Sequence, residues 1–169
     1  MTFKKNIWAF IIIGILGTVG HFIYELTNQN FIAGLFFPVN ESTWEHLKLL
    51  FFPTLIYSLF EYIFSEEKPE NYFFAVTYSV ICGMLSIVAL FYTYRGVLGK
   101  NIDFINISIY FISIIIMLVK KRRILRSGKF SSKAFFWVSE ILLVLTTALF
   151  MIWSYNPPSI GIFTPPVSV

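Results

Sequence analysis

The sequence predicts an all-α fold, an integral membrane bundle of five transmembrane helices with a cytoplasmic N-terminus and an extracytoplasmic C-terminus. Of its 169 residues, 57% are hydrophobic and only 13% are charged, whereas a soluble domain carries about 25% charged residues. The apolar residues form five blocks, each of roughly the 20 residues that a helix needs to cross the hydrocarbon core. Basic residues gather on one side of these blocks, which sets the orientation.

The five spans are predicted to form a single transmembrane domain over residues 1–169. They cover about residues 7–26, 41–64, 72–94, 104–119 and 134–153. In the first span, Gly14, Gly17 and Gly20 leave a face where another helix can approach closely. No small-residue cleavage site follows this block, so we expect a retained span rather than a signal peptide.

Residues 27–39 are predicted to connect the first two spans without forming a helix. Asn28, Gln29, Asn30, Gly34 and Pro38 all disfavour one. The prolines of the C-terminal tail likewise predict that it is not helical.

The second span begins with a capping pattern. Asn40 or Ser42 is the candidate N-cap. The stretch from Ser42 to Glu45 matches a capping box, in which the Glu45 side chain would return to the Ser42 amide. Pro53, farther along, is expected to kink this helix.

The orientation follows from the basic residues of the connections. With the N-terminus in the cytoplasm, ten Lys and Arg residues lie inside and three, Lys48, Arg95 and Lys100, lie outside. The net charge of +4 is therefore a topology signal and does not indicate a nucleic-acid partner. The predicted location is a cell membrane, of the bacterial cytoplasmic type, with the lipid bilayer as the main partner. A homo- or hetero-oligomer is compatible with five short spans.

Both histidines then fall at the extracytoplasmic ends of the first two spans. His21 and Glu25 are one helical turn apart, and Glu41 and Glu45 share a second face. Imidazole and carboxylate groups together suit zinc or another divalent metal, which would activate a bound water. The predicted catalytic residues are His21, Glu25, Glu41, Glu45 and His46, and the predicted metal ligands are His21, Glu25, Glu45 and His46.

Other chemistry is possible for the same residues. A histidine oriented by a carboxylate is a general base, and Ser42 or Thr43 would then be the nucleophile. Arg95 suits an anionic group of a substrate. The predicted substrate-binding residues are Arg95, Trp44, Asn40 and Ser42.

Each residue also has a simpler, structural interpretation. Glu45 and Ser42 would cap a helix, His21 and Glu25 would tie two helices together, and Trp44 and Arg95 would anchor helix ends at the interface.

Glu140 lies about two turns into the fifth span, where an ionisable group is costly and serves as a proton or ion relay in some membrane proteins.

The segments Gly20-His21-Phe22, Gly34-Leu35-Phe36 and Pro38-Val39-Asn40-Glu41-Ser42-Thr43-Trp44-Glu45-His46-Leu47-Lys48, with the tail Tyr155-Asn156-Pro157-Pro158, resemble an uncharacterised family of small bacterial multi-pass membrane proteins. The resemblance implies an integral membrane fold and no known activity. In that family, a histidine and then an acidic residue follow the double proline. Here Ser159 follows Pro158, and the tail has no acidic residue.

Two functions fit these observations. The first is a metal-assisted hydrolase or transferase that acts on a lipid-like substrate at headgroup depth. The second is a non-catalytic membrane component that binds or transports an ion, a small ligand or a partner subunit. A structural subunit, in which the polar cluster only locks the fold, is a third reading.

Overall fold

The computed structural model describes residues 3–166, and the secondary structure in this range is entirely helical. The helices are α1 (Phe3–Leu26), α2 (Phe31–Phe36), α3 (Thr43–Phe64), α4 (Tyr72–Leu98), α5 (Asp103–Ser127), α6 (Lys133–Tyr155) and the 3₁₀-helix η1 (Gly161–Phe163). Five of them, α1, α3, α4, α5 and α6, are long and apolar enough to cross a membrane. The all-α membrane bundle predicted from the sequence is therefore confirmed.

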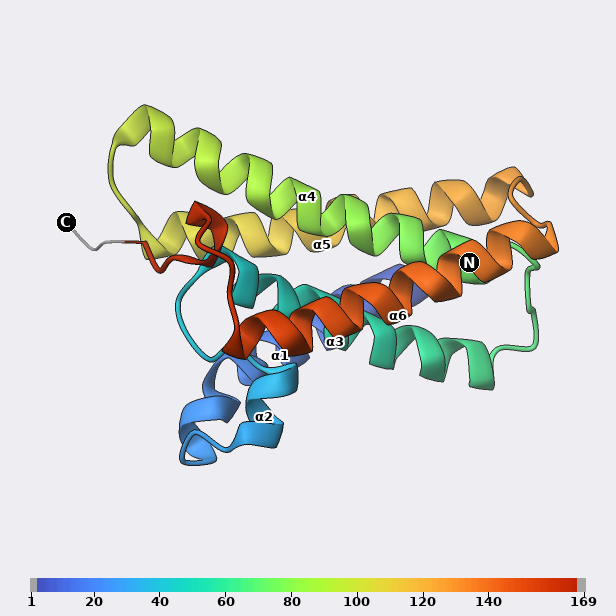
Figure 1. Cartoon of the computed structure of the whole chain (residues 1–169). Helices are drawn as coiled ribbons and strands as arrows, with labels where there is room; N and C mark the ends of the chain where they lie inside the picture. The colour runs from blue at the N-terminus through green and yellow to red at the C-terminus, as the bar shows by residue number, and fades with distance from the viewer. Residues whose placement is uncertain (1–2, 167–169) are drawn as a thin grey trace.

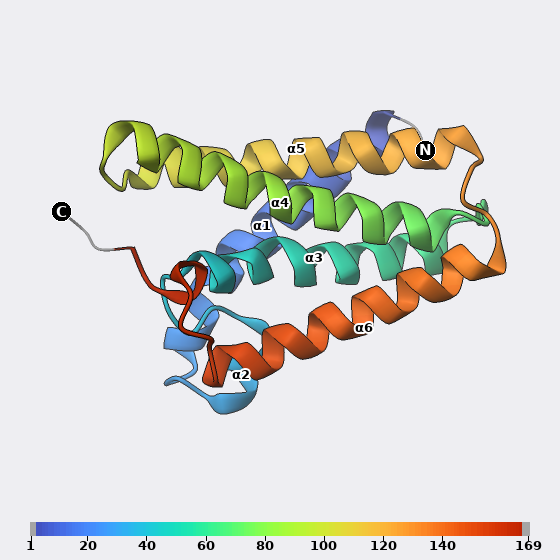
Figure 2. The same ribbon diagram turned by 45° about the horizontal axis from the view of Figure 1, so that its top comes forward.

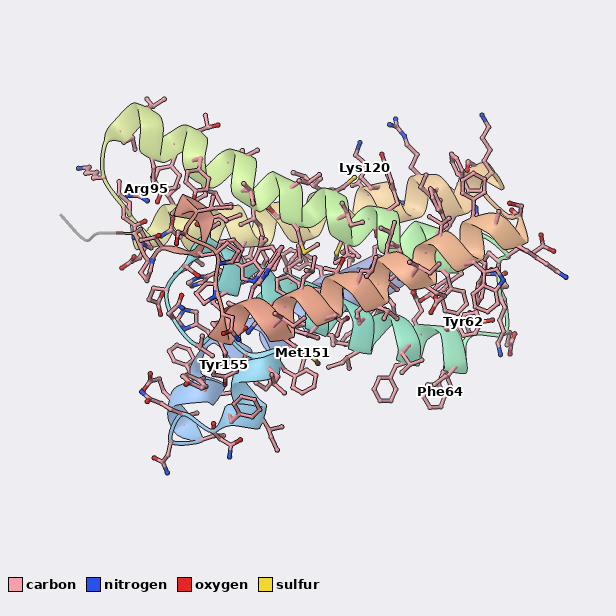
Figure 3. The ribbon with its side chains drawn as sticks, in the orientation of Figure 1. Tyr62, Phe64, Arg95, Lys120, Met151 and Tyr155 are labelled. Carbon is pink, nitrogen blue, oxygen red and sulfur yellow. The ribbon has the colours of Figure 1, made fainter. Side chains whose placement is uncertain are left out.

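The long helices form an elongated bundle. Helices α3, α4 and α5 run side by side, α1 crosses them obliquely, and α6 flanks α3 and α4 (Figures 1 and 2). We call the end that contains His21 and His46 the His end, and the opposite end, which contains Arg122 and Arg126, the Arg end. Figure 3 shows Arg95 and Tyr155 at the His end.

Helices α4 and α5 extend the farthest beyond the C-terminal ends of the predicted spans. Helix α5 continues to Ser127 instead of ending near residue 119, and α4 continues to Leu98. The apolar block ends earlier, but Lys and Arg are good helix formers, so the helix persists after the hydrophobic pattern stops. Each helix ends at a glycine in the left-handed region, Gly99 (φ 69°) and Gly128 (φ 61°), which is a common helix stop.

The connection between α1 and α3 contains the short helix α2, so the prediction of a purely irregular segment is wrong. Asn28 and Gln29 adopt left-handed backbone conformations, and the side chain of Asn30 then caps the new helix. Its Oδ1 accepts hydrogen bonds from the amides of Ile32 (2.9 Å) and Ala33 (3.3 Å). Asparagine disfavours the interior of a helix but is a good N-cap, and Asn30 therefore starts α2. The tail likewise contains a single 3₁₀ turn, η1.

The glycine face of α1 does allow close packing, as predicted. At Gly17 a Cβ atom would collide with the Tyr110 hydroxyl and the Leu49 carbonyl. That hydroxyl donates hydrogen bonds to the carbonyls of Ile13 (3.0 Å) and Leu49 (3.2 Å), which joins α5 to α1 and α3. The packing fixes the height of α1, and therefore of His21, against α3.

The outward faces of the bundle are apolar. Helix α6 buries only Ser139, Phe150 and Ser154, whereas Trp137 and Val144 are more than 60% exposed. Helices that expose this much apolar surface belong in a lipid environment.

Candidate metal centre

The stretch from Pro38 to Lys48 holds the polar residues of the His end. Ser42 is the N-cap of α3, and its Oγ accepts a hydrogen bond from the Glu45 amide (3.4 Å). The second half of the predicted capping box does not form, because Asn40 Oδ1 accepts the Ser42 amide (2.9 Å) in place of the Glu45 carboxylate. Glu41 precedes the helix, so it does not share a helical face with Glu45.

Three side chains converge at the surface of the His end. We call His21 of α1, Glu41 of the loop and His46 of α3 the His cluster. The two Nε2 atoms are 3.2 Å apart, and Glu41 Oε2 lies 3.3 Å from His46 Nε2 and 3.7 Å from His21 Nε2. These are groups that can bind a divalent ion, and their ligand atoms lie close enough together for one.

The orientation of the His46 ring is fixed from behind. Its Nδ1 lies 2.9 Å from the carbonyl oxygen of Ser42, so Nδ1 carries a proton and donates it to that carbonyl. In the neutral ring, Nε2 is then a bare lone pair that faces the other two groups. A backbone carbonyl behind an imidazole is the usual outer support of a metal-binding histidine.

The His cluster requires a positive charge. Glu41 Oε2 and a bare His46 Nε2 are both acceptors, and at 3.3 Å they repel each other unless a proton or a metal ion lies between them. The imidazoles of His21 and His46 hold the pKa of the Glu41 carboxyl well below its ordinary value. Glu41 is therefore ionised near neutral pH and supplies negative charge to the group.

The cluster is open on one side. The side chains of His21 and His46 are about one-third exposed (34% and 30%), and that of Glu41 is 68% exposed. A ligand bound to these three groups would remain accessible to water and to molecules at the membrane surface.

Glu45 lies in a different cluster. Its carboxylate pairs with Lys48 (Nζ to Oε2, 2.8 Å) and accepts hydrogen bonds from the Val39 amide (2.9 Å) and the Ser154 hydroxyl (3.0 Å). Lys48 also donates to the carbonyls of Gly34 (2.8 Å) and Phe37. We call Glu45, Lys48 and Ser154 the Lys48 cluster. It joins α2, α3 and α6, and its charged groups are almost completely buried.

The remaining predicted residues lie outside the His cluster. Glu25 is exposed one turn beyond His21 and is not among the groups that could share an ion with it. Arg95 lies over the Phe91 ring at 5.3 Å, at the last turns of α4 (Figure 3). Trp44 packs against Phe150, Trp153 and Phe163, with ring centroids 4.8–5.0 Å apart.

A second buried ion pair, between Glu61 of α3 and Lys121 of α5, lies toward the Arg end. Lys121 Nζ lies 2.7 Å from Glu61 Oε2 and 3.1 Å from Ser58 Oγ. The Tyr72 hydroxyl bonds to the same carboxylate (2.7 Å). The available signal was Glu61 near the end of α3 and Lys121 in the last third of α5. The sequence pattern does not say that the two helices are neighbours at that height.

Glu140 lies in α6, as expected, and faces a cavity of about 490 Å³ between α3, α4 and α6. Its Oε1 is buried and has no hydrogen-bond partner among the described residues. The cavity walls include Ser58 and Tyr72 of the Lys121 pair.

No curated protein and no solved structure matches the chain. A family model, described as a family of unknown function, matches residues 2–168. Because that match covers nearly the whole chain, the protein belongs to the family of unknown function DUF6512.

Proposed function

We propose that the protein binds a divalent metal ion, zinc in the simplest case, through His21, Glu41 and His46. The observation that carries this is the triangle of ligand atoms, with sides of 3.2, 3.3 and 3.7 Å. Tetrahedral zinc with ligands at about 2.0–2.1 Å requires ligand atoms roughly 3.3 Å apart. The described positions therefore suit such an ion with little movement. Glu41 takes the place that the sequence suggested for Glu25 and Glu45.

The open side of the cluster leaves a coordination position for water or a substrate. A metal with three protein ligands and one open position is typical of catalytic zinc sites, where it lowers the pKa of its bound water to about 7. With an N-terminus in the cytoplasm, as the basic residues predict, the His end faces outward at the level of the lipid headgroups. We therefore propose hydrolysis or group transfer on a lipid-like or lipid-linked substrate.

Two further groups of the predicted site would assist this reaction. Glu25 is an exposed carboxylate one turn after His21 on the same helix, and it would serve as an acid or base. Arg95 would hold an anionic group of the substrate, since its guanidinium is at the same end of the bundle. Asn40, Ser42 and Trp44 would shape the site through the local structure that they support.

A second candidate function is metal or ligand binding without catalysis, and one observation favours it. Glu45, the carboxylate that immediately precedes His46 on the same helix, is buried in the ion pair with Lys48. It is therefore not positioned as a general base for a metal-bound water. A binding or transport component needs only the metal ligands.

Metal content tests the proposal. The detergent-purified protein, incubated with zinc and passed over a desalting column, should retain about one equivalent per chain by elemental mass spectrometry. H21A, H46A and E41Q should each lose it, whereas E25Q, a carboxylate on the same helix, should keep it as the matched control. Two results would contradict metal binding by this cluster. One is retention of zinc by all variants at a thermal stability equal to that of the parent, and the other is absence of zinc from the parent itself.

Catalysis is tested separately with the zinc-loaded parent. Turnover of lipid-linked phosphate or acyl esters that disappears in H46A supports the first function. Stoichiometric metal without turnover of such substrates supports the second.

A further inference from the structure

A second cavity lies at the Arg end, far from the His cluster. It has a volume of about 720 Å³ and lies between the N-terminal part of α1 and the C-terminal half of α5. Helices α1 and α5 are in close contact near Gly14 and Gly17 of α1. Because α1 runs obliquely to α5, the two helices are not parallel on either side of this contact (Figure 2). This crossing leaves the cavity between them. Its volume is within the range of ligand sites, about 300–1,000 Å³.

The cavity has one strongly basic end. Arg122, Arg123 and Arg126 line it, and Arg122 and Arg126 are four residues apart on the same helical face. No acidic residue is among the described residues of the lining. Three guanidinium groups without a counter-charge form a site for phosphate, which arginine binds with paired hydrogen bonds.

Two polar atoms of the lining lack partners. Arg122 Nε, a donor, and Asn6 Oδ1, an acceptor, are both buried and make no hydrogen bond to any described residue. Buried polar atoms are nearly always satisfied, so an unpaired donor and acceptor in one cavity point to a ligand that supplies both. A phosphate oxygen would satisfy the arginine, and a hydroxyl would satisfy the asparagine.

The rest of the lining is apolar. Ile7 and Phe10 contribute from α1, and Ile115 and Val119 contribute from α5. Ile115 lies two helical turns, about 10 Å, from Arg122 along the axis of α5. The cavity therefore extends from the arginines along apolar residues toward the bundle centre. A lipid with its headgroup at the arginines would place an acyl chain along the same path.

We propose that this cavity is a binding site for one anionic phospholipid of the surrounding bilayer, with its phosphate on the arginines and an acyl chain between α1 and α5. Basic pockets between transmembrane helices bind anionic headgroups in this way. A phosphoglycerol headgroup matches the unpaired atoms best, because its phosphate accepts and its hydroxyls donate. The site is independent of the proposed metal centre, since it is formed by other residues at the opposite end.

The test is native mass spectrometry of the detergent-purified protein, incubated with equal amounts of phosphatidylglycerol and phosphatidylcholine with identical acyl chains. We expect the anionic lipid to be retained over the zwitterionic one by about ten-fold. Both lipids share the phosphate, but only phosphatidylcholine places a quaternary ammonium beside the arginines, and like charges repel. The variant R122Q/R126Q should lose this preference. The variant K129Q/K133Q removes the same charge at exposed positions outside the cavity and should keep it.

A second pair of variants tests the acyl chain. Val119→Trp fills the cavity without changing charge, and Ile107→Trp is the control on the same helix, with nearly equal exposure (58% and 57%) and outside the lining. Only the first should lower retention of phosphatidylglycerol. Equal retention of both lipids, equal loss in both double variants, or full displacement by inorganic phosphate would overturn the proposal.

Discussion

Two charged clusters share the stretch from Pro38 to Lys48, and they differ in exposure and in how fully their polar atoms are paired. The Lys48 cluster is closed, since its Lys48 and Glu45 side chains are 0% and 2% exposed and their polar atoms are satisfied by α2, α3 and α6. The His cluster is open, since Glu41 is 68% exposed and three ligand atoms face one another. The closed cluster holds the helix ends in place, and the open one has unused capacity to bind.

The comparison predicts that stability depends on the first cluster and ligand binding on the second. Lys48→Met should cause the largest loss of unfolding free energy, about 3–5 kcal/mol, because it leaves the Glu45 carboxylate buried without a partner. Unfolding of the detergent-solubilised protein in rising SDS, followed by circular dichroism, measures this. The double variant Lys48→Met/Glu45→Gln should recover most of the loss. A loss as small as that of an exposed lysine would mean that the pair does not hold the fold.

The ion pair near the Arg end sharpens the comparison. Lys121→Met should lower the unfolding free energy by about 3 kcal/mol or less, since an unpaired buried charge is costly but Glu61 is 10% exposed and can be partly hydrated. The same SDS titration applies. The neighbouring Lys120→Met serves as control, because Lys120 contributes to neither ion pair, and it should change stability by about 0.5 kcal/mol at most. Equal losses in both variants would contradict the assignment.

The His cluster should behave in the opposite way. In the absence of metal, His46→Ala should cost about 1 kcal/mol, the net value of the hydrogen bond to the Ser42 carbonyl. Zinc at 100 times its dissociation constant should stabilise the parent by about 2.7 kcal/mol, and His46→Ala should abolish that gain. Thermal denaturation with zinc and with a chelator measures both. A zinc-dependent gain that survives in His46→Ala would place the ion elsewhere.

The smallest expected effect is that of pH on Glu41. Its pKa is lowered in the folded state, so the stability it contributes is fully present above its ordinary value of 4.5 and is lost as the pH falls below that. The contribution should stay below about 1 kcal/mol because the carboxylate is largely exposed to solvent. The difference in midpoint between the parent and Glu41→Gln should therefore shrink as the pH is lowered from 6 toward 3. A midpoint difference that grows as the pH falls would contradict a lowered pKa of Glu41 in the folded state.

Much of the fold could be predicted from the sequence because lipid imposes simple rules. A helix that crosses a bilayer must be long and apolar, so the five spans follow from composition. The Ser42 cap and the glycine face of α1 follow from local chemistry in the same way. The convergence of His21 and His46 also follows, because two antiparallel spans joined by a short connection bring their adjacent ends together.

The partners of the charged residues were decided only by the tertiary structure. Glu45 and His46 are adjacent in sequence, but successive residues of a helix point about 100° apart, so one faces the α2–α6 contact and the other faces α1. Glu41 reaches the histidines because it precedes the helix, where no periodicity specifies its direction. Lys48 and Lys121 look like surface cations in the sequence, and their burial depends on acceptors from distant segments: Ser154 in one case and Glu61 in the other. Local patterns determine which segments form helices, whereas the pairing of buried charges depends on which helices are neighbours and at what height.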